Sequence, residues 1–158
     1  MFTFDWNQSL VDFIRVAIAF VLALPIGWER IRSRRHIGLR TFPIVAIASC
    51  GYILIIRALP NITPEAEARA LQGLLSGIGF IGGGAILKQG LDVRGLATAA
   101  SIWNTGAIGA AVAFGREEIA IILSLINFLM LYFLTPVARE YKEADEASRQ
   151  ETDEEEDL

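Results

Sequence analysis

The most constraining feature of this chain is a glycine cluster inside an apolar stretch. Residues Ser76 to Gly84 read Ser-Gly-Ile-Gly-Phe-Ile-Gly-Gly-Gly and lie within an uncharged run of eighteen residues, Ala70 to Leu87. Such a run is about long enough to cross a bilayer, but each glycine costs a helix about 1 kcal/mol relative to alanine. Because lipid cannot hydrate unpaired backbone groups, we expect the segment to be either packed tightly between helices or broken open along a polar cavity.

The same glycines match the pattern Gly-x-Gly-x-x-Gly, but their surroundings exclude a dinucleotide site. That motif needs a preceding strand and an acidic residue about 20 positions later, whereas position 102 is Ile. The P-loop pattern Gly-x-x-x-x-Gly-Lys-Ser/Thr does not occur in the sequence either. The sequence therefore predicts no enzymatic activity and no cofactor.

Composition indicates one compact polytopic membrane unit, because 53% of the 158 residues are hydrophobic and the mean hydropathy is positive. Residues 137–158 hold ten acidic and three basic side chains, a net charge of −7, which leaves +3 on residues 1–136. We therefore predict a transmembrane domain at 1–136 and an acidic cytoplasmic tail at 137–158. A like-charge block cannot bury apolar area, so the tail should be partly disordered and act either as a solubilising segment or as a weak cation- or partner-binding strip.

Single cysteine and histidine residues limit the metal chemistry of the chain. Cys50 alone excludes an intramolecular disulfide, and with only His36 in a basic loop a zinc site is not expected; the identity of any metal stays unknown. The basic residues adjoin a membrane segment and lack interleaved aromatics, so nucleic-acid binding is not predicted. No cleavable signal is evident at the start, and the first apolar segment should stay in the mature protein.

Hydropathy predicts five membrane spans. They run approximately over Ser9–Trp28, Thr41–Leu59, Ala70–Leu87, Leu96–Phe114 and Ile119–Thr135. Ten Lys and Arg residues flank these spans on one side and three on the other. The positive-inside rule then places the N-terminus outside and the C-terminus in the cytoplasm, which predicts an all-α five-transmembrane-helix bundle in the lipid bilayer.

Helical geometry divides the glycines of the third span into two sides. One side holds Gly73, Gly77 and Gly84, and the other holds Gly79, Gly82 and Gly83. A bulky stripe lies between them, formed by Leu74, Ile78 and Ile81. We expect a helix sandwiched between two close neighbours with the stripe toward lipid; the alternative is a helix broken near Gly82 to Gly84.

Polar side chains in the fourth span share an arc of the helix: Thr98, Ser101, Asn104 and Thr105. They are either interhelical glue, worth about 0.6 kcal/mol per hydrogen bond, or the lining of a water-accessible path in which Asn104 coordinates an ion or orients water. In the fifth span Ala120, Ser124 and Asn127 share one side, which we expect to face inward.

Asp12 and Arg15 are charges that must enter the hydrocarbon region in the first span. Their i, i+3 spacing lets them pair, which reduces a penalty of about 2.5–3.5 kcal/mol for each charge at a helix centre. They are candidates for an ion path, although a position near the interface would also allow the side chains to reach water. At the cytoplasmic rim, a second group consists of Glu29, Arg30, Arg40, Thr41 and Arg94, in which Glu29 can neutralise Arg40 or Arg94.

Four motifs occur together in a fixed order: Gly27-Trp-Glu-Arg30, Gly38-Leu-Arg-Thr41, Ser76 to Gly84, and Val93-Arg-Gly-Leu-Ala-Thr-Ala-Ala-Ser-Ile-Trp103. Together they resemble the membrane domain of the MgtC/SapB family over roughly Leu10 to Leu134. The matching positions are Glu29, Arg30, Arg40, Thr41, Gly77, Gly79, Phe80, Gly82, Gly84, Arg94, Gly95, Thr98 and Trp103.

The resemblance implies a bacterial inner-membrane protein linked to growth in low magnesium and, in pathogens, to virulence. It also implies regulation of a membrane ATPase rather than magnesium transport itself. Longer members add an ACT-like C-terminal domain, and this chain resembles a short form with an acidic tail instead. Our leading hypothesis is a homo-oligomer, with a dimer favoured, that modulates a membrane ATPase; the alternative is a homo-oligomeric ion or solute transporter.

Overall fold

The structure of the chain, a computed structural model, describes residues 5–32, 38–89 and 92–156. These residues form α1 (Trp6–Arg32), α2 (Thr41–Arg57), α3 (Pro64–Gly84), β1 (Leu87–Gln89), β2 (Asp92–Arg94), α4 (Leu96–Ala113) and α5 (Glu117–Glu156). The two strands form an antiparallel hairpin in which Lys88 is opposite Val93. The predicted all-α class and the order of the five helices are confirmed.

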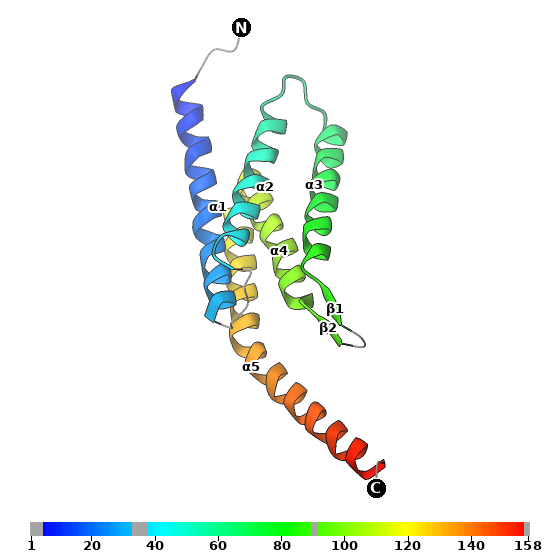
Figure 1. The fold of residues 1–158 in the computed structure, drawn as a ribbon. Helices are drawn as coiled ribbons and strands as arrows, with labels where there is room; N and C mark the ends of the chain where they lie inside the picture. Colours follow the sequence, from blue (N-terminus) through cyan, green and yellow to red (C-terminus); the bar gives the residue numbers. More distant parts are fainter. Residues whose placement is uncertain (1–4, 33–37, 90–91, 157–158) are drawn as a thin grey trace.

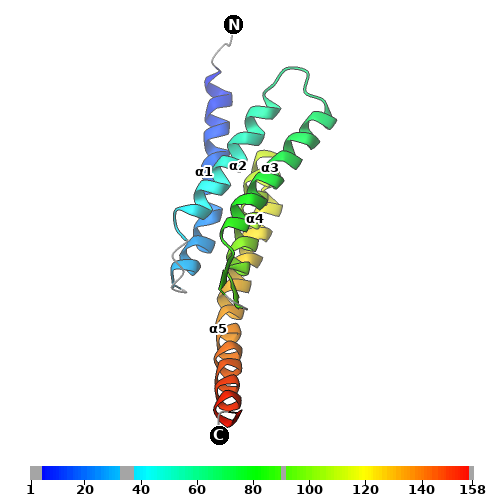
Figure 2. The ribbon, with the colours of Figure 1, turned by 45° about the vertical axis from the view of Figure 1, so that its right-hand side comes forward.

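Helix α4 lies at the centre of the bundle and packs against α1, α2, α3 and α5. Helix α3 packs against α4 and, less extensively, α2, and it lies at an edge (Figure 1, Figure 2). The last turn of α1, the first turn of α2, the hairpin and the first turn of α4 lie at one end of the bundle, here called the hairpin end (Figure 1). The connection between α2 and α3 lies at the opposite end.

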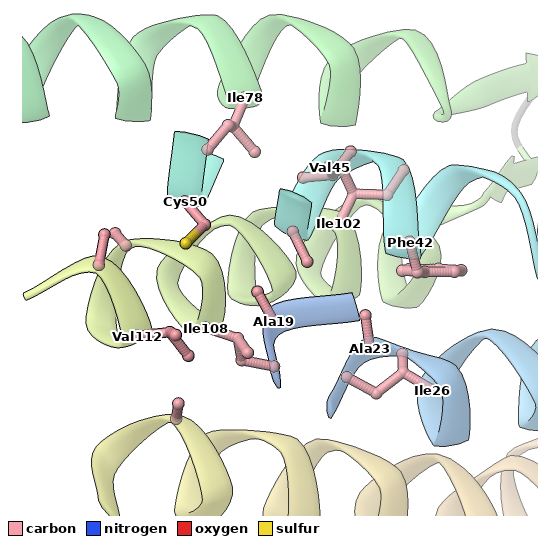
Figure 3. Packing of buried hydrophobic residues seen from close by; sticks show 14 of the residues in the cluster. Ala19, Ala23, Ile26, Phe42, Val45, Cys50, Ile78, Ile102, Ile108 and Val112 are labelled. Carbon is pink, nitrogen blue, oxygen red and sulfur yellow. The ribbon is translucent and has the colours of Figure 1, made fainter. Parts of the chain in front are cut away.

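The core consists of small and branched apolar side chains from α1, α2 and α4, with Ile78 of α3 reaching it from the edge (Figure 3). Its fully buried members are Ala19, Ala23, Ile26, Phe42, Ala46, Cys50, Ile53, Ile102, Ile108, Val112, Ala113 and, from α5, Ala120. Alanine and glycine at the contact positions let helix backbones approach closely, which is how helices pack where lipid removes the usual hydrophobic driving force.

Two glycines of α4 set the closeness of this packing. An added Cβ at Gly109 would collide with the carbonyl oxygen of Ala46 in α2, and an added Cβ at Gly106 would collide with the side chain of Ile78 in α3. The first collision is with backbone, which cannot turn aside as a side chain can. The α2–α4 contact therefore depends on glycine at position 109.

Helix α3 begins six residues before the predicted span, because a local start signal precedes the apolar residues. Thr63 is the N-cap and accepts a hydrogen bond from the backbone N–H of Ala66 at 3.3 Å, and Pro64 follows at the first helical position. Hydrogen bonds from its own backbone N–H and from Thr63 hold the pKa of the Glu65 carboxyl below its ordinary value. The helix is continuous through Gly82 and Gly83 and ends at Gly84, so it has no break inside it. The predicted end of the span at Leu87 is wrong, because Leu87 belongs to β1.

Among the described residues, three helices are long and apolar enough to cross a membrane: Trp6–Arg32, Leu96–Ala113 and Glu117–Ala138. Helix α2 is apolar but shorter, at 17 residues. The predicted total of five spans and the predicted orientation stay predictions. Helix α5 continues past Pro136 to Glu156, and the division of the chain into a membrane domain and an acidic tail also stays a prediction.

Gly95 joins the hairpin to α4 in a conformation that requires glycine. Its φ is +95°, and an added Cβ would collide with the carbonyl oxygen of Ala85. We expect Gly95→Ala to lower the free energy of unfolding by about 3 kcal/mol, since the collision adds to a left-handed strain of about 1–2 kcal/mol.

Gly115 provides the control for this prediction. Its φ is +72°, but an added Cβ there would meet no heavy atom within 4 Å. Gly115→Ala therefore carries the left-handed strain without the collision. Unfolding of both variants in detergent, followed by circular dichroism, measures the difference. Equal losses of stability would show that the contact with Ala85 is not tight.

Candidate functional site

The polar arc of α4 is used for hydrogen bonds inside the bundle. Ser101 Oγ donates to the carbonyl oxygen of Ala97 at 2.8 Å and lies 3.1 Å from Oδ1 of Asn127 on α5. Asn104 Nδ2 donates to the carbonyl oxygen of Leu123 on α5 at 3.3 Å. The contacts with Asn127 and Leu123 join α4 to α5.

The remaining arc residues, Thr98 and Thr105, are buried. Thr105 Oγ1 donates to the carbonyl oxygen of Ser101 at 2.7 Å, a bond within α4 that satisfies the hydroxyl without a neighbouring helix. From α5, Ser124 Oγ donates to the carbonyl oxygen of Leu22 on α1 at 2.6 Å. The expectation that Ala120, Ser124 and Asn127 face inward is confirmed for the first two by their burial and for Asn127 by its contact with α4.

Asp12 and Arg15 lie together in a polar cavity of about 420 Å³ toward the end of the bundle opposite the hairpin. Gln8, Leu54, Arg57 and Ala58 complete its lining. Gln8 Nε2 donates to Asp12 Oδ1 at 2.9 Å, so the carboxylate has a hydrogen-bond donor within its own helix. Both predicted residues therefore share one cavity with a second arginine from α2.

None of the polar-arc residues lines this cavity. Ala19 of α1, Cys50 of α2 and Ile108 and Val112 of α4 form part of the buried apolar core around the middle of the bundle (Figure 3). The two groups of residues proposed for an ion path belong to separate sites in this structure, and their role in conduction stays a prediction.

Arg57 is a residue of this cavity that sequence reasoning did not single out. Its Nη1 donates to the carbonyl oxygen of Ala113 at 2.9 Å, where α4 ends, and its Nε lies 3.7 Å from Glu67 Oε1 on α3. Its guanidinium also lies 5.4 Å from the ring centroid of Phe114. Arg57 thus connects α2, α3 and the end of α4. Its position in the last turn of α2 predicts contact with the carbonyls of α2 itself, so no sequence signal indicated its bond to the end of α4.

The predicted rim residues occupy the hairpin end but differ in exposure. Glu29 and Arg30 are 5% and 2% exposed, whereas Arg40 and Arg94 are exposed and Thr41 is half-buried. Gly27 and Gly38 bring the end of α1 against the residues before α2, since an added Cβ at Gly38 would lie 2.9 Å from the carbonyl oxygen of Gly27. The proposed pairing of Glu29 with Arg40 or Arg94 stays a prediction.

The glycines of α3 do not lie where the sequence placed them. Gly82 packs on α4, with its added Cβ at 3.2 Å from the carbonyl oxygen of Ala99. The other five would meet no heavy atom within 4 Å: Gly73, Gly77, Gly79, Gly83 and Gly84. The prediction that α3 is sandwiched between two neighbours is therefore wrong for the single chain.

The bulky stripe of α3 also faces the opposite way from the prediction, toward the core of the bundle. Ile78 is only 4% exposed and Leu74 is partly buried, and both pack against the core rather than facing lipid (Figure 3). Ile81, at 49% exposed, lies at the margin. Large side chains contribute more contact area than glycine, so they occupy the face that meets α4 within the chain.

Metal-ligating side chains do not converge in the part of the chain that the structure describes. Within residues 5–32, 38–89 and 92–156, no group of three or more His, Cys, Asp or Glu side chains is placed to hold a metal ion.

Comparison with known proteins now identifies the family. A family model described as MgtC family matches residues 16–140. The chain belongs to the MgtC family. This match covers α2, α3 and α4 and parts of α1 and α5, and it confirms the resemblance carried by the four motifs.

Several relatives are similar over most of this MgtC family member. A protein of Synechocystis named slr0014 is 37% identical over 134 residues, covering 85% of the chain and 55% of the relative. Protein MgtC of Salmonella typhimurium is 34% identical over 113 residues, covering 72% and 48%. Protein MgtC of Brucella abortus is 32% identical over 124 residues, covering 78% and 51%. The chain thus spans about half the length of these relatives, and no solved structure matches it.

Proposed function

We propose that this protein is a non-enzymatic component of the bacterial inner membrane that supports magnesium homeostasis and adaptation to low magnesium by binding and modulating a membrane ATPase. Membership of the MgtC family and the long apolar helices support the membrane location and the link to magnesium. The surface of α3 supports association of the chain with itself, and the proposed mode of action gives the associated form the ATPase as its target.

The exposed side of α3 is the observation that carries the proposal. We call it the outer face; it consists of Arg69, Gln72, Gly73, Ser76, Gly77, Gly79, Phe80, Gly83 and Gly84, all of them exposed. Phe80, 85% exposed, is the single large apolar side chain among them. A face of glycine and polar groups makes few favourable apolar contacts with lipid, and its polar side chains find no hydrogen-bond partners among acyl chains. Such a face therefore favours contact with protein.

The spacing along the outer face fits a second helix. Arg69, Gln72, Ser76, Gly79 and Gly83 follow one another at intervals of three and four residues, the repeat of left-handed helix packing, and small residues on such a seam permit close approach. A glutamine amide both donates and accepts, so Gln72 can pair with Gln72 of a second copy across a two-fold axis. We therefore assign the outer face to a homodimer and take the ATPase as the target of that dimer.

Co-reconstitution tests the proposed function. The purified chain and a membrane ATPase of the same membrane are placed in one liposome, and ATP hydrolysis is measured with and without the chain. We expect the rate to change with the wild-type chain and to remain at the value of the ATPase alone with Gly79→Leu, which obstructs the outer face. An ATPase rate that does not respond to the wild-type chain would overturn the proposal.

A second candidate function, ion or solute transport by a homo-oligomer, is favoured by one observation, the polar cavity of Asp12 and Arg15. Liposomes that contain the purified chain and a magnesium-sensitive dye distinguish the two functions. Under our proposal these liposomes are no more permeable to magnesium than empty ones. A selective flux that disappears in Asp12→Asn would establish transport instead.

A further inference from the structure

In addition to the cavity of Asp12 and Arg15, a second cavity lies at the hairpin end. It is separate from the outer face of α3. Its volume is about 400 Å³, and its lining comes from α1, β2, the first turn of α4 and the middle of α5. Three parts of the chain that are distant in sequence thus line one space: the end of α1, the junction of β2 with α4, and α5. Its position beside the predicted cytoplasmic surface of the membrane gives access both to lipid headgroups and to solutes.

Two arginines from different elements line this cavity. Arg30 belongs to the last turn of α1 and is 2% exposed, and Arg94 belongs to β2 and is exposed. Both side chains also take part in other interactions of the folded chain. A guanidinium carries five N–H donors in a planar fork, and this geometry matches the oxygen atoms of a phosphate.

The start of α4 contributes to the same cavity. Gly95, Leu96 and Ala97 line it. Gly95 is the N-cap residue of this 18-residue helix, and a glycine has no side chain that could accept a hydrogen bond from the first turn. The first N–H groups of a helix carry partial positive charge and lack acceptors within the helix. They reinforce the attraction of the two arginines for an anion.

The opposite wall of the cavity is apolar. Met130, Leu131 and Leu134 of α5 form it, and Thr135 adds one hydroxyl. Met130 and Leu134 are 54% and 55% exposed, so the wall continues onto the outer surface of the predicted fifth span. Positive charge beside an open apolar wall fits an anionic head attached to an apolar chain, and it does not fit a cation.

We propose that this cavity binds a phosphate-bearing anion, namely the headgroup phosphate of an anionic phospholipid, with Arg30 and Arg94 on the phosphate and the α5 wall along an acyl chain. The cytoplasmic leaflet is rich in anionic lipid, and basic residues at its surface are attracted to it. A free phosphate offers the same oxygen atoms to the arginines, so the experiment distinguishes the two sources. This site is independent of the homodimer and of the ATPase.

Native mass spectrometry of the full chain, released from detergent after titration with phosphatidylglycerol or phosphatidylcholine, measures the binding. We expect phosphatidylglycerol to bind at least about tenfold more tightly than phosphatidylcholine, and Arg94→Gln to weaken phosphatidylglycerol binding about tenfold. Lys88→Gln is the matched control, because it removes the same charge from an exposed position of the hairpin that does not line the cavity. It should leave the affinity unchanged.

A second variant keeps all charges and fills the cavity. Leu134→Trp should weaken phosphatidylglycerol binding without loss of thermal stability, since Leu134 is an exposed wall residue. Millimolar inorganic phosphate should fail to displace the lipid; displacement that depends on Arg94 would identify free phosphate as the source and uphold the site. Equal binding of both lipids, or equal losses for Arg94→Gln and Lys88→Gln, would overturn the proposal.

Discussion

Replacing Gly109 by valine should lower the free energy of unfolding by about 3 kcal/mol, at the upper end of the usual cost of overpacking. An added Cβ at this position collides with the carbonyl oxygen of Ala46, and that carbonyl belongs to the backbone of α2. A flexible side chain would turn away, but a helix backbone can yield only by moving α2 away from α4. Such a movement would also loosen Phe42 and Cys50, which are fully buried beside this contact.

Gly51→Val is the matched control for this prediction. Gly51 lies in α2, five residues from Ala46, and an added Cβ there would meet no heavy atom within 4 Å. Thermal unfolding of both variants in the same detergent, monitored by circular dichroism, gives the comparison. We expect the Gly51→Val protein to unfold close to the wild-type temperature, and equal losses in the two variants would contradict the close approach of α2 and α4.

Replacing Gly79 by leucine should weaken dimerisation about 100-fold while leaving the single chain stable. The position has open space in the single chain, so the leucine meets nothing within its own bundle. In the proposed dimer the two leucines would meet across the two-fold axis and hold the helices apart, which removes the close contact of the glycine seam. The substitution at Gly79 should therefore weaken association without lowering stability, whereas the substitution at Gly109 should lower the stability of the single chain.

Energy transfer between labelled chains, diluted into lipid vesicles over a range of protein-to-lipid ratios, measures this association. Gly51→Leu provides the same substitution at an open position of α2 and should associate like the wild type. A wild-type chain that stays monomeric at high protein density would refute the homodimer. If the Gly79→Leu chain associates as strongly as the wild type, the interface does not lie on the outer face.

Sequence predicted the helices better than it predicted their mutual contacts. Hydropathy located all five helices, because an apolar run of the right length is a local property. It placed the start of α3 at Ala70 rather than Pro64, because a hydropathy window responds to the polar residues Glu65, Glu67 and Arg69 and not to the Thr63-Pro64 start signal.

The orientation of α3 was not predictable from its angular pattern alone. Geometry separated five of the six glycines from Leu74 and Ile78, whereas Gly82 packs on α4 as Ile78 does. It does not say whether a glycine face meets its own chain or another. The structure places Ile78 against Gly106 of α4, a pairing of a large and a small residue that becomes visible only when both helices are known. The polar arc of α4, by contrast, was predicted residue by residue, and Asn127 was placed on the correct side of α5.

The cavity at the hairpin end was only partly visible in the sequence. Arg30 and Arg94 were grouped at one end of the bundle because loop charges determine orientation. Their meeting with Met130 and Leu134 depends on the path of α5 across the bundle, and no pattern in a single sequence gives that path. Long-range contacts of this kind are set by tertiary packing.

The central place of α4 has a consequence for biogenesis. Three helices leave the ribosome before it, and two of them, α1 and α2, can pair with each other at once. The main contact of helix α3 is with α4, which has not yet been synthesised at that point, so Ile78 cannot yet pack against Gly106. In a nascent chain halted after the hairpin, α3 therefore has only its smaller contact with α2, and it gains its main contact once α4 has been translated.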